Sequence, residues 1–303
     1  MGKFYGMSIT VIGESNIDIF VQPIGGDALH EAARICTPSH ISFHHGGVAR
    51  NIAHNLCLMG HDVRLMTVFG DDEFAARLID DCKTIGMDLS LSTQFQEAKS
   101  PIFLSFNDET GNMQSAHSDI ELNSRMDLDW LKGKMDEINR SKIVVADTLL
   151  SAEALAHLID YCDVPLYIDS VSPKRAKRLS EAMEMSEKME FFALKCTLSE
   201  AQALTNHSNP FEAAKALNAK GIKEVYLTLG EQGAVFSSAS ETVHFPALPA
   251  HVVNVTGSGD AFFAGIIHAH SLGKKGNLAV PIGLEAARLT LECVGPVNLA
   301  MRR

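Results

Sequence analysis

The sequence Asn-Val-Thr-Gly-Ser-Gly-Asp, residues 254–260, lies between a short strand-like run, residues 250–253, and an apolar segment of helical character. We expect a strand, a turn of small residues and then a helix that begins near Asp260. Gly257 and Gly259 allow the chain to turn tightly and leave the backbone amides uncovered. These amides and the dipole of the following helix favour an anion at this point. The stretch therefore predicts an anion-binding turn with a carboxylate at its edge.

Asp260 has two interpretations. Within the positive end of a helix, its carboxylate is expected to stay ionised and could accept a proton. An anion cradle beside a base is what phosphoryl transfer to a hydroxyl group requires. The same residue would also suit an ordinary helix N-terminus as a capping or first-turn acid. The stretch by itself leaves both interpretations open.

Length and composition indicate a globular protein with a large core. The chain has 303 residues, 46% of them hydrophobic and 21% charged, which suits either two domains or one large α/β domain with an appendage. Its net charge of −11 disfavours polyanionic partners, so we expect no nucleic acid as a partner. The one dense basic cluster, residues 174–178, is expected to form a solvated helix face.

No membrane or disulfide signal is present in the sequence. No apolar run approaches the roughly 18–20 residues that a membrane span needs, so we expect no membrane partner. The six cysteines are scattered and form no CxxC pair. This usage is typical of reduced thiols in a cytoplasmic protein and predicts neither a disulfide framework nor a zinc site.

Short β-branched runs alternate with longer helical patterns through most of the chain. The alternation predicts an α/β fold with a doubly wound, mostly parallel sheet flanked by helices. The expected strands are residues 9–12, 63–68, 143–146, 166–168, 191–194 and 225–229. The expected helices are residues 48–59, 72–85, 127–139, 152–161, 176–185, 198–205, 210–219, 260–271 and 279–293. Sites in such sheets gather at the carboxyl ends of the strands.

Two regions interrupt this alternation. Residues 20–45 are extended and irregular, and residues 100–117 have the pattern of a hairpin. Since so few strands are unstable alone, we expect a small β lid over the strand ends, formed by residues 20–45 and 95–119. The core then comprises residues 7–19, 46–94 and 120–303. Such a lid would exclude water from a transfer reaction; a decorative hairpin or a homodimer interface through the lid are the alternatives.

A second glycine pair, Gly46 and Gly47, opens another helix, in which Asn51 lies one turn from the start. Upstream, Asn16 and Asp18 follow the first strand and lie two residues apart, hence on one face. A carboxylate, two carboxamides and closely approaching amides suit the binding of a polyhydroxylated sugar.

Taken together, these segments resemble the ribokinase-like (PfkB) family of carbohydrate and nucleoside kinases. The resemblance covers nearly the whole chain, with the elements in the family's order. It implies a ribokinase-like fold and a phosphotransferase that uses ATP and Mg²⁺ to phosphorylate an alcohol group of a small sugar or nucleoside. The absence of a GxxxxGK[ST] sequence excludes a P-loop mechanism.

The resemblance also implies roles for individual residues. Asp260 matches the base that deprotonates the acceptor hydroxyl, and the amides around Gly257, Ser258 and Gly259 match the anion hole. The sugar-binding positions of the family are matched by Asp18, Asn16, Gly46, Gly47 and Asn51. The nucleotide-binding positions are matched by Thr228, Gly230, Gly233, Lys195 and Thr197. Glu200 matches the residue that positions Mg²⁺ through water. Cys196 and Thr197 replace the usual Pro and Asn.

Within the family, residues 99–117, 142–147 and 164–172 most resemble bacterial pseudouridine kinases. This implies phosphorylation of the 5′-hydroxyl of pseudouridine and places Asp169 at the substrate site. Asn254 also follows the pseudouridine-kinase form. It lacks the carboxylate that helps many members to bind a monovalent cation, so dependence on K⁺ stays open. Asp147 is either a site carboxylate or a strand-end cap. The alternatives in function are a ribokinase, fructokinase or adenosine-kinase-like enzyme, or a degenerate sugar-binding member.

Overall fold

The computed structural model describes residues 8–24, 38–109 and 113–302. Its main sheet has eight strands in the order β14-β13-β12-β11-β10-β9-β1-β4. The pairs from β12 to β4 are parallel, whereas β13 and β14 are antiparallel additions at one edge. The strands are β1 (Ile9–Ile12), β4 (Val63–Met66), β9 (Ile143–Asp147), β10 (Leu166–Asp169), β11 (Phe191–Thr197), β12 (Ile222–Thr228), β13 (Ala234–Ser238) and β14 (Thr242–Phe245). The expected doubly wound sheet is confirmed.

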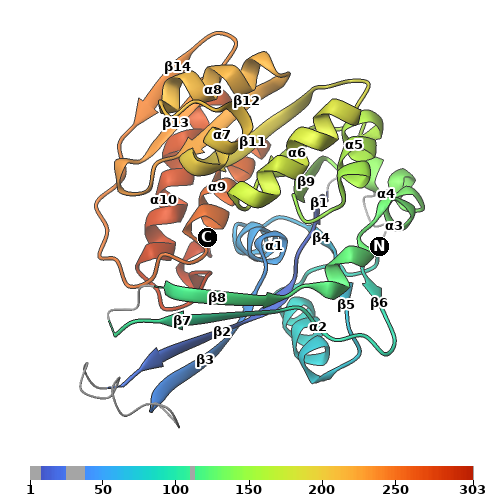
Figure 1. Cartoon of the computed structure of the whole chain (residues 1–303). Coiled ribbons are helices and arrows are strands. Elements are labelled where there is room, and N and C mark those ends of the chain that lie inside the picture. Colours follow the sequence, from blue (N-terminus) through green and yellow to red (C-terminus); the bar gives the residue numbers. More distant parts are fainter. Residues whose placement is uncertain (1–7, 25–37, 110–112, 303) are drawn as a thin grey trace.

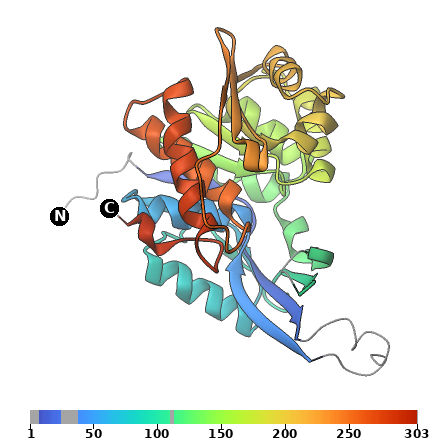
Figure 2. The same ribbon diagram turned by 90° about the vertical axis from the view of Figure 1, so that its left-hand side faces the viewer.

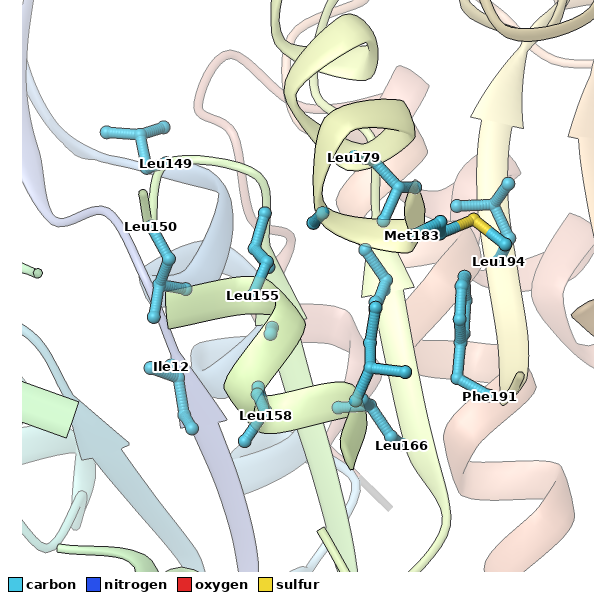
Figure 3. Packing of buried hydrophobic residues seen from close by; sticks show 14 of the residues in the cluster. Ile12, Leu149, Leu150, Leu155, Leu158, Leu166, Leu179, Met183, Phe191 and Leu194 are labelled. Atoms are coloured by element: carbon cyan, nitrogen blue, oxygen red, sulfur yellow. The ribbon is translucent and has the colours of Figure 1, made fainter. Parts of the chain in front are cut away.

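Helices cover both faces of this sheet (Figure 1). One face packs against α1 (Val48–Leu58), α9 (Ser258–Ser271) and α10 (Val280–Leu291). The other packs against α3 (Leu128–Lys132), α4 (Met135–Asn139), α5 (Ala152–Tyr161), α6 (Pro173–Met185), α7 (Leu198–Thr205) and α8 (Pro210–Ala219). Figure 3 shows this second face, where Leu155, Leu158 and Leu179 pack against strand residues such as Leu166 and Leu194. Strands buried on both faces are nearly all apolar, as parallel sheets require.

A separate four-stranded sheet, ordered β3-β2-β7-β8, projects beside α1 (Figures 1 and 2). Its strands are β2 (Asn16–Pro23), β3 (Ser39–Gly46), β7 (Ile102–Asn107) and β8 (Met113–Asp119). This sheet, the lid, contains the expected hairpin. β2 begins at Asn16, so Asn16 and Asp18 lie on the lid side of the boundary drawn at residue 19. The part of the predicted lid within residues 25–37 is outside the described residues.

The remaining elements complete the edge of the core. Helix α2 (Glu73–Ile85) is capped by Asp72, whose side chain accepts the Ala75 amide. Strands β5 (Val68–Phe69) and β6 (Thr93–Gln94) form a two-stranded pair. A 3₁₀ turn, η2 (Glu121–Arg125), follows the lid, and another, η3 (Gly230–Gln232), follows β12. Within the described ranges, none of the helices has both the length and the apolar character needed to span a bilayer.

Two sequence-based expectations about elements are wrong. Residues 250–253 form no strand; Val252 and Val253 are about half exposed. The main sheet already ends at β14, and Pro246 and Pro249 remove hydrogen-bond donors from the segment. The helix expected over residues 127–139 is divided at Gly133 into α3 and α4.

Candidate active site

Asn16 and Asp18 begin the lid strand β2 directly after the turn that ends β1. The Asn16 Nδ2 group donates a 2.8 Å hydrogen bond to Asp18 Oδ1, and both side chains are buried. Burial raises the pKa of Asp18 to about 6, although Asn16 and Arg50 act in the opposite direction. The carboxylate therefore faces the site from a weakly solvated position, in which hydroxyl groups of a ligand would replace lost water.

Gly46 and Gly47 form the opposite wall of this part of the site. A Cβ atom at Gly46 would lie 2.2 Å from Asp18 Oδ2, and one at Gly47 would lie 2.4 Å from the Glu14 carbonyl oxygen. Gly47 also has a φ of 97°, which L side chains rarely adopt. Only glycine allows the start of α1 to approach the β1–β2 turn this closely.

Asn51 connects the two glycine turns that the sequence singled out. It lies in the first turns of α1, and its Nδ2 group donates a 2.9 Å hydrogen bond to Asp260 Oδ2 in α9. The turn before α9 has its own tight contact, because a Cβ at Gly257 would lie 2.0 Å from the Pro296 carbonyl oxygen. The structure thus brings together residues far apart in sequence.

Asp260 is buried in the first turn of α9. Burial and the nearby negative charge of Asp169 raise the pKa of Asp260 to about 7, against the opposing effects of Lys195 and Asn51. The expectation that this carboxylate simply stays ionised is therefore wrong, since burial outweighs the helix dipole. A carboxylate that titrates near neutral pH is well matched to accept a proton.

Lys195 lies beneath the turn before α9. Its Nζ atom is 3.1 Å from Asp169 Oδ2 and would be 3.0 Å from a Cβ at Gly259. Although burial disfavours the ammonium ion, the negative charges of Asp169, Glu200 and Asp260 raise the pKa of Lys195 above its usual range. A fixed positive charge therefore adjoins the predicted anion hole.

Asp169 does not line the substrate site as the sequence suggested. Its side chain has no exposed surface, and its carboxylate accepts the Val171 amide at 2.8 Å while pairing with Lys195. Burial raises its pKa, with Lys195 acting against the shift. Asp169 therefore pairs with Lys195 and has no side-chain surface exposed to the site.

Thr197 and Glu200 form a capping box at the start of α7. Glu200 Oε2 accepts hydrogen bonds from the Thr197 amide at 2.8 Å and from Ser170 Oγ at 2.7 Å. Thr197 thus retains a structural role at the position where Asn was expected. In the part of the chain that the structure describes, no group of three or more His, Cys, Asp or Glu side chains could hold a metal.

The residues predicted to contact the nucleotide lie along one edge of the sheet. Thr228 pairs in register with Thr197 at the carboxyl ends of β12 and β11. The turn that follows has φ values of 60° at Gly230 and 93° at Gly233. A Cβ at Gly233 would lie 2.0 Å from the Phe245 carbonyl oxygen, so this glycine is needed for the approach of β14.

Sequence reasoning missed a buried polar cluster around Glu14. Asn123 Nδ2 donates to Glu14 Oε1 at 3.1 Å, and Arg175 Nη1 lies 3.5 Å from Glu14 Oε2. Burial raises the pKa of Glu14, and Arg175 opposes the shift. The signal in the sequence was an acidic residue in the turn that carries Asn16, but its partners come from distant segments.

Asp147 takes one of its two expected roles, whereas the basic cluster departs from the expected solvated helix face. Asp147 accepts the amides of Glu14 at 2.7 Å and Leu149 at 2.9 Å, which is the cap alternative. Burial and the charge of Glu14 raise its pKa to about 7. The basic cluster is not wholly solvated, because Arg178 donates to the backbone carbonyls of residues 148–150. Burying the carbonyls of that loop requires such a donor.

Comparison with known proteins gives a family match and relatives that cover most of the chain. A family model described as pfkB family carbohydrate kinase matches residues 7–301. The chain is 28% identical to the pseudouridine kinase of Escherichia coli (strain K12), over 85% of this chain and 82% of that protein. It is 24% identical to the guanosine-inosine kinase of Exiguobacterium acetylicum, over 92% of both. The structure of a ribokinase from Thermotoga maritima superposes with a TM-score of 0.81 at 20% identity, covering 99% of this chain and 96% of that one, and shares the fold.

Proposed function

The chain belongs to the pfkB family of carbohydrate kinases, which are phosphotransferases acting on hydroxyl groups, and from this premise we propose that it phosphorylates the 5′-hydroxyl of pseudouridine. ATP is the phosphoryl donor in this proposal. Similarity to a pseudouridine kinase and the residue Asn254 support the choice of acceptor. The reduced thiols and the small, uncharged acceptor suit a cytoplasmic enzyme.

The observation that carries the proposal is the hydrogen bond from Asn51 to Asp260. This bond joins Asp260, the proposed catalytic base at the start of α9, to α1, the helix that follows the Gly46–Gly47 turn of the proposed sugar site. A hydroxyl group bound by Asn51 would therefore already lie beside Asp260. Holding the reacting groups in this way supplies much of the rate enhancement in phosphoryl transfer.

The chain's own residues divide the work as follows. Asp18, Asn16 and the glycine turn before α1 orient the sugar. Asp260 takes the proton of the acceptor hydroxyl. The oxygen of that hydroxyl bonds to the γ-phosphorus of ATP while the bond between this phosphorus and the leaving oxygen of ADP breaks. The amides of residues 257–259, with Lys195 beneath them, offset the charge on the transferred group.

Nucleotide and metal are assigned to the neighbouring strand ends. Thr228, Gly230 and Gly233 would contact the phosphates of ATP, with Lys195 and Thr197 at the adjacent strand. Mg²⁺, when bound, neutralises charge on the phosphate oxygens. Glu200 would hold it through water, because one carboxylate oxygen is already used in the capping box.

K⁺ is left out of the proposal because the position of Asn254 does not fit a cation. Its Nδ2 group donates a 2.7 Å hydrogen bond to the Val294 carbonyl oxygen, and its Oδ1 atom accepts the Thr256 amide at 2.9 Å. The side-chain amide thus already joins the turn before α9 to the loop after α10. An N–H donor takes the place that a metal ligand would need.

The lid supports a further proposal, a homodimer through its outer surface. Ile41 and Phe43 on β3 are more than half exposed, as is Met113 on β8. Exposed apolar side chains on a small sheet are a typical interface. The molecular mass in solution tests this point independently of catalysis.

A panel of acceptors tests the proposed reaction. The purified protein is assayed with ATP and Mg²⁺ against pseudouridine, uridine, adenosine, ribose and fructose, and the product is identified by mass. We expect the highest kcat/KM for pseudouridine. Preferred turnover of ribose or adenosine would reject pseudouridine alone, and binding of a sugar without turnover of any acceptor would reject the enzyme.

A further inference from the structure

A cavity of about 410 Å³ lies next to the Glu14 cluster. Its lining includes Asn123 and Ser124 of η2, Leu149 and Ser151 of the loop before α5, and Arg175 and Arg178 of α6. These elements come from the end of the lid and from the edge of the core. The volume is within the range of small-molecule sites.

The cavity brings together an acceptor and a donor that both lack hydrogen-bond partners. Asn123 is 5% exposed; its Nδ2 group donates to Glu14, and its Oδ1 atom has no partner. Arg175 Nη1 lies close to Glu14, but it too makes no hydrogen bond. Buried polar atoms without partners are costly and uncommon in folded proteins. The unpartnered oxygen of Asn123, in the lining of the cavity together with Arg175, therefore points to a ligand.

Glu14 fixes this pair relative to the sugar site. It belongs to the same turn as Asn16 and Asp18, and the charge of Asp18 acts on its carboxylate. Suppose that Asp18 holds the sugar of a nucleoside and that the 5′-hydroxyl lies at Asp260. The nucleobase is then attached at C1′, across the ring oxygen from C4′, the carbon that carries the 5′-hydroxymethyl group. The Glu14 cluster therefore adjoins the turn that is proposed to hold the sugar.

We propose that Asn123 and Arg175 read the base of a nucleoside substrate through a lactam edge, an N–H group beside a carbonyl. Asn123 Oδ1 accepts the ring N–H, and the Arg175 guanidinium donates to the carbonyl oxygen. This inference rests on the proposed nucleoside kinase function. Pseudouracil, uracil and hypoxanthine carry such an edge, whereas cytosine and adenine present the donor and acceptor in the reverse order. Glu14 is a positioning residue that holds both readers.

The first test needs no altered protein. Wild-type enzyme is assayed with pseudouridine, uridine and inosine, with cytidine and adenosine, and with 3-methyluridine, in which the lactam N–H is lost. We expect kcat/KM for lactam nucleosides to exceed that for the other group and for 3-methyluridine by roughly tenfold or more, because a site built to hydrogen-bond a substrate rejects analogues that leave its buried groups unpaired.

The second test uses Asn123→Ala, with Arg175→Lys as a variant that keeps the charge beside Glu14. Asn139→Ala is the matched control, since Asn139 lies on α4 outside the cavity lining and bonds only to the Tyr161–Asp163 segment. We expect Asn123→Ala to lower kcat/KM for uridine by about tenfold while leaving the already low value for 3-methyluridine unchanged. Arg175→Lys should lower both values, because methylation leaves the carbonyl oxygen in place. The control should change neither value.

Two kinds of failure are distinguishable. If wild-type enzyme phosphorylates free sugars and no nucleoside, the proposed acceptor is wrong and the base-reading inference falls with it. If nucleosides are good substrates but methylation has no effect, or Asn123→Ala lowers activity on uridine and 3-methyluridine alike, the nucleoside kinase stands and the assignment of these readers is overturned.

Discussion

The glycines of the turn before α1 are buried, whereas the turn before α9 is partly exposed. A Cβ at Gly46 would meet the Asp18 carboxylate at 2.2 Å, and the neighbouring side chains are buried. In the second turn a Cβ at Gly259 would meet only the flexible end of Lys195, and Val255 is 67% exposed. The Asp18 side chain and the Glu14 backbone shape the first turn, whereas backbone and a single buried cation shape the second.

The difference follows from what each turn is proposed to bind. A sugar must be told apart from other sugars, which requires fixed carboxylate and carboxamide groups at close range. A phosphoryl group is the same in every reaction of this kind, so amide groups and positive charge are sufficient. Specificity is therefore expected to depend on the turn before α1, and rate on the turn before α9.

The largest effect is expected from Asp260→Asn, which tests whether the turn before α9 determines the rate. The variant keeps the shape and the neighbouring hydrogen bond but cannot accept the hydroxyl proton. We expect kcat to fall by at least roughly 10², with both substrates still binding. Single-turnover rates and calorimetric titrations measure the two quantities separately, with Asp129→Asn, an exposed carboxylate on α3, as control. A rate near that of the wild type would remove Asp260 as the base.

Gly46→Ala tests the turn before α1. The added methyl group must displace the Asp18 carboxylate, at a cost of about 1–3 kcal/mol for overpacking. We expect KM for the acceptor to rise by roughly tenfold, while KM for ATP stays unchanged. Gly133→Ala is the matched control, because nothing lies within 4 Å of that position. Equal effects on both substrates would indicate a general loss of structure and not a local one.

The pH dependence of the rate tests the protonation state of Asp260 at the turn before α9. Since the pKa of Asp260 is raised to about 7, we expect kcat/KM to fall as the pH drops through that region. Lys195 lowers this pKa, so Lys195→Met should move the acid limb to higher pH. Lys177→Met, on the exposed face of α6, should leave the limb in place. An unmoved limb in Lys195→Met would show that Lys195 does not act on the base.

The smallest effect is expected from the monovalent cation. Because the Asn254 amide already joins the two loops, replacing K⁺ by Na⁺ at constant ionic strength should leave kcat unchanged. Asn254→Asp removes that donor and should introduce a measurable preference for K⁺. Strong activation of the wild-type enzyme by K⁺ would contradict the interpretation of Asn254.

Much of the fold and part of the site could be predicted because the signals are local. Alternating apolar runs and helical patterns identified β1, β4 and the strands from β9 to β12, and small residues marked the turns before α1 and α9. The strand expected over residues 250–253 was wrong because β-branched residues favour a strand only where a neighbouring strand can pair with them. Among the described residues, no strand of the main sheet lies beyond β14.

The interpretation of Asp169 failed for a related reason. Its position after a strand was visible in the sequence, but its complete burial beneath Lys195 was not. Whether a carboxylate at a strand end contacts a ligand or a lysine depends on the elements that pack around it in the folded protein. The same holds for Asn123 and Arg175, which meet at Glu14 from segments with no shared pattern.

The sequence by itself determined the doubly wound sheet, the lid and the identity of the groups at Asp18, Asn51 and Asp260, because periodicity and turn chemistry act over a few residues. Only the tertiary structure decided how those groups behave. It buried Asp260 until its pKa approached neutrality, placed Lys195 under the anion turn and assembled the cavity beside Glu14. Burial and electrostatic coupling are sums over neighbours from the whole chain, and no local stretch of sequence contains them.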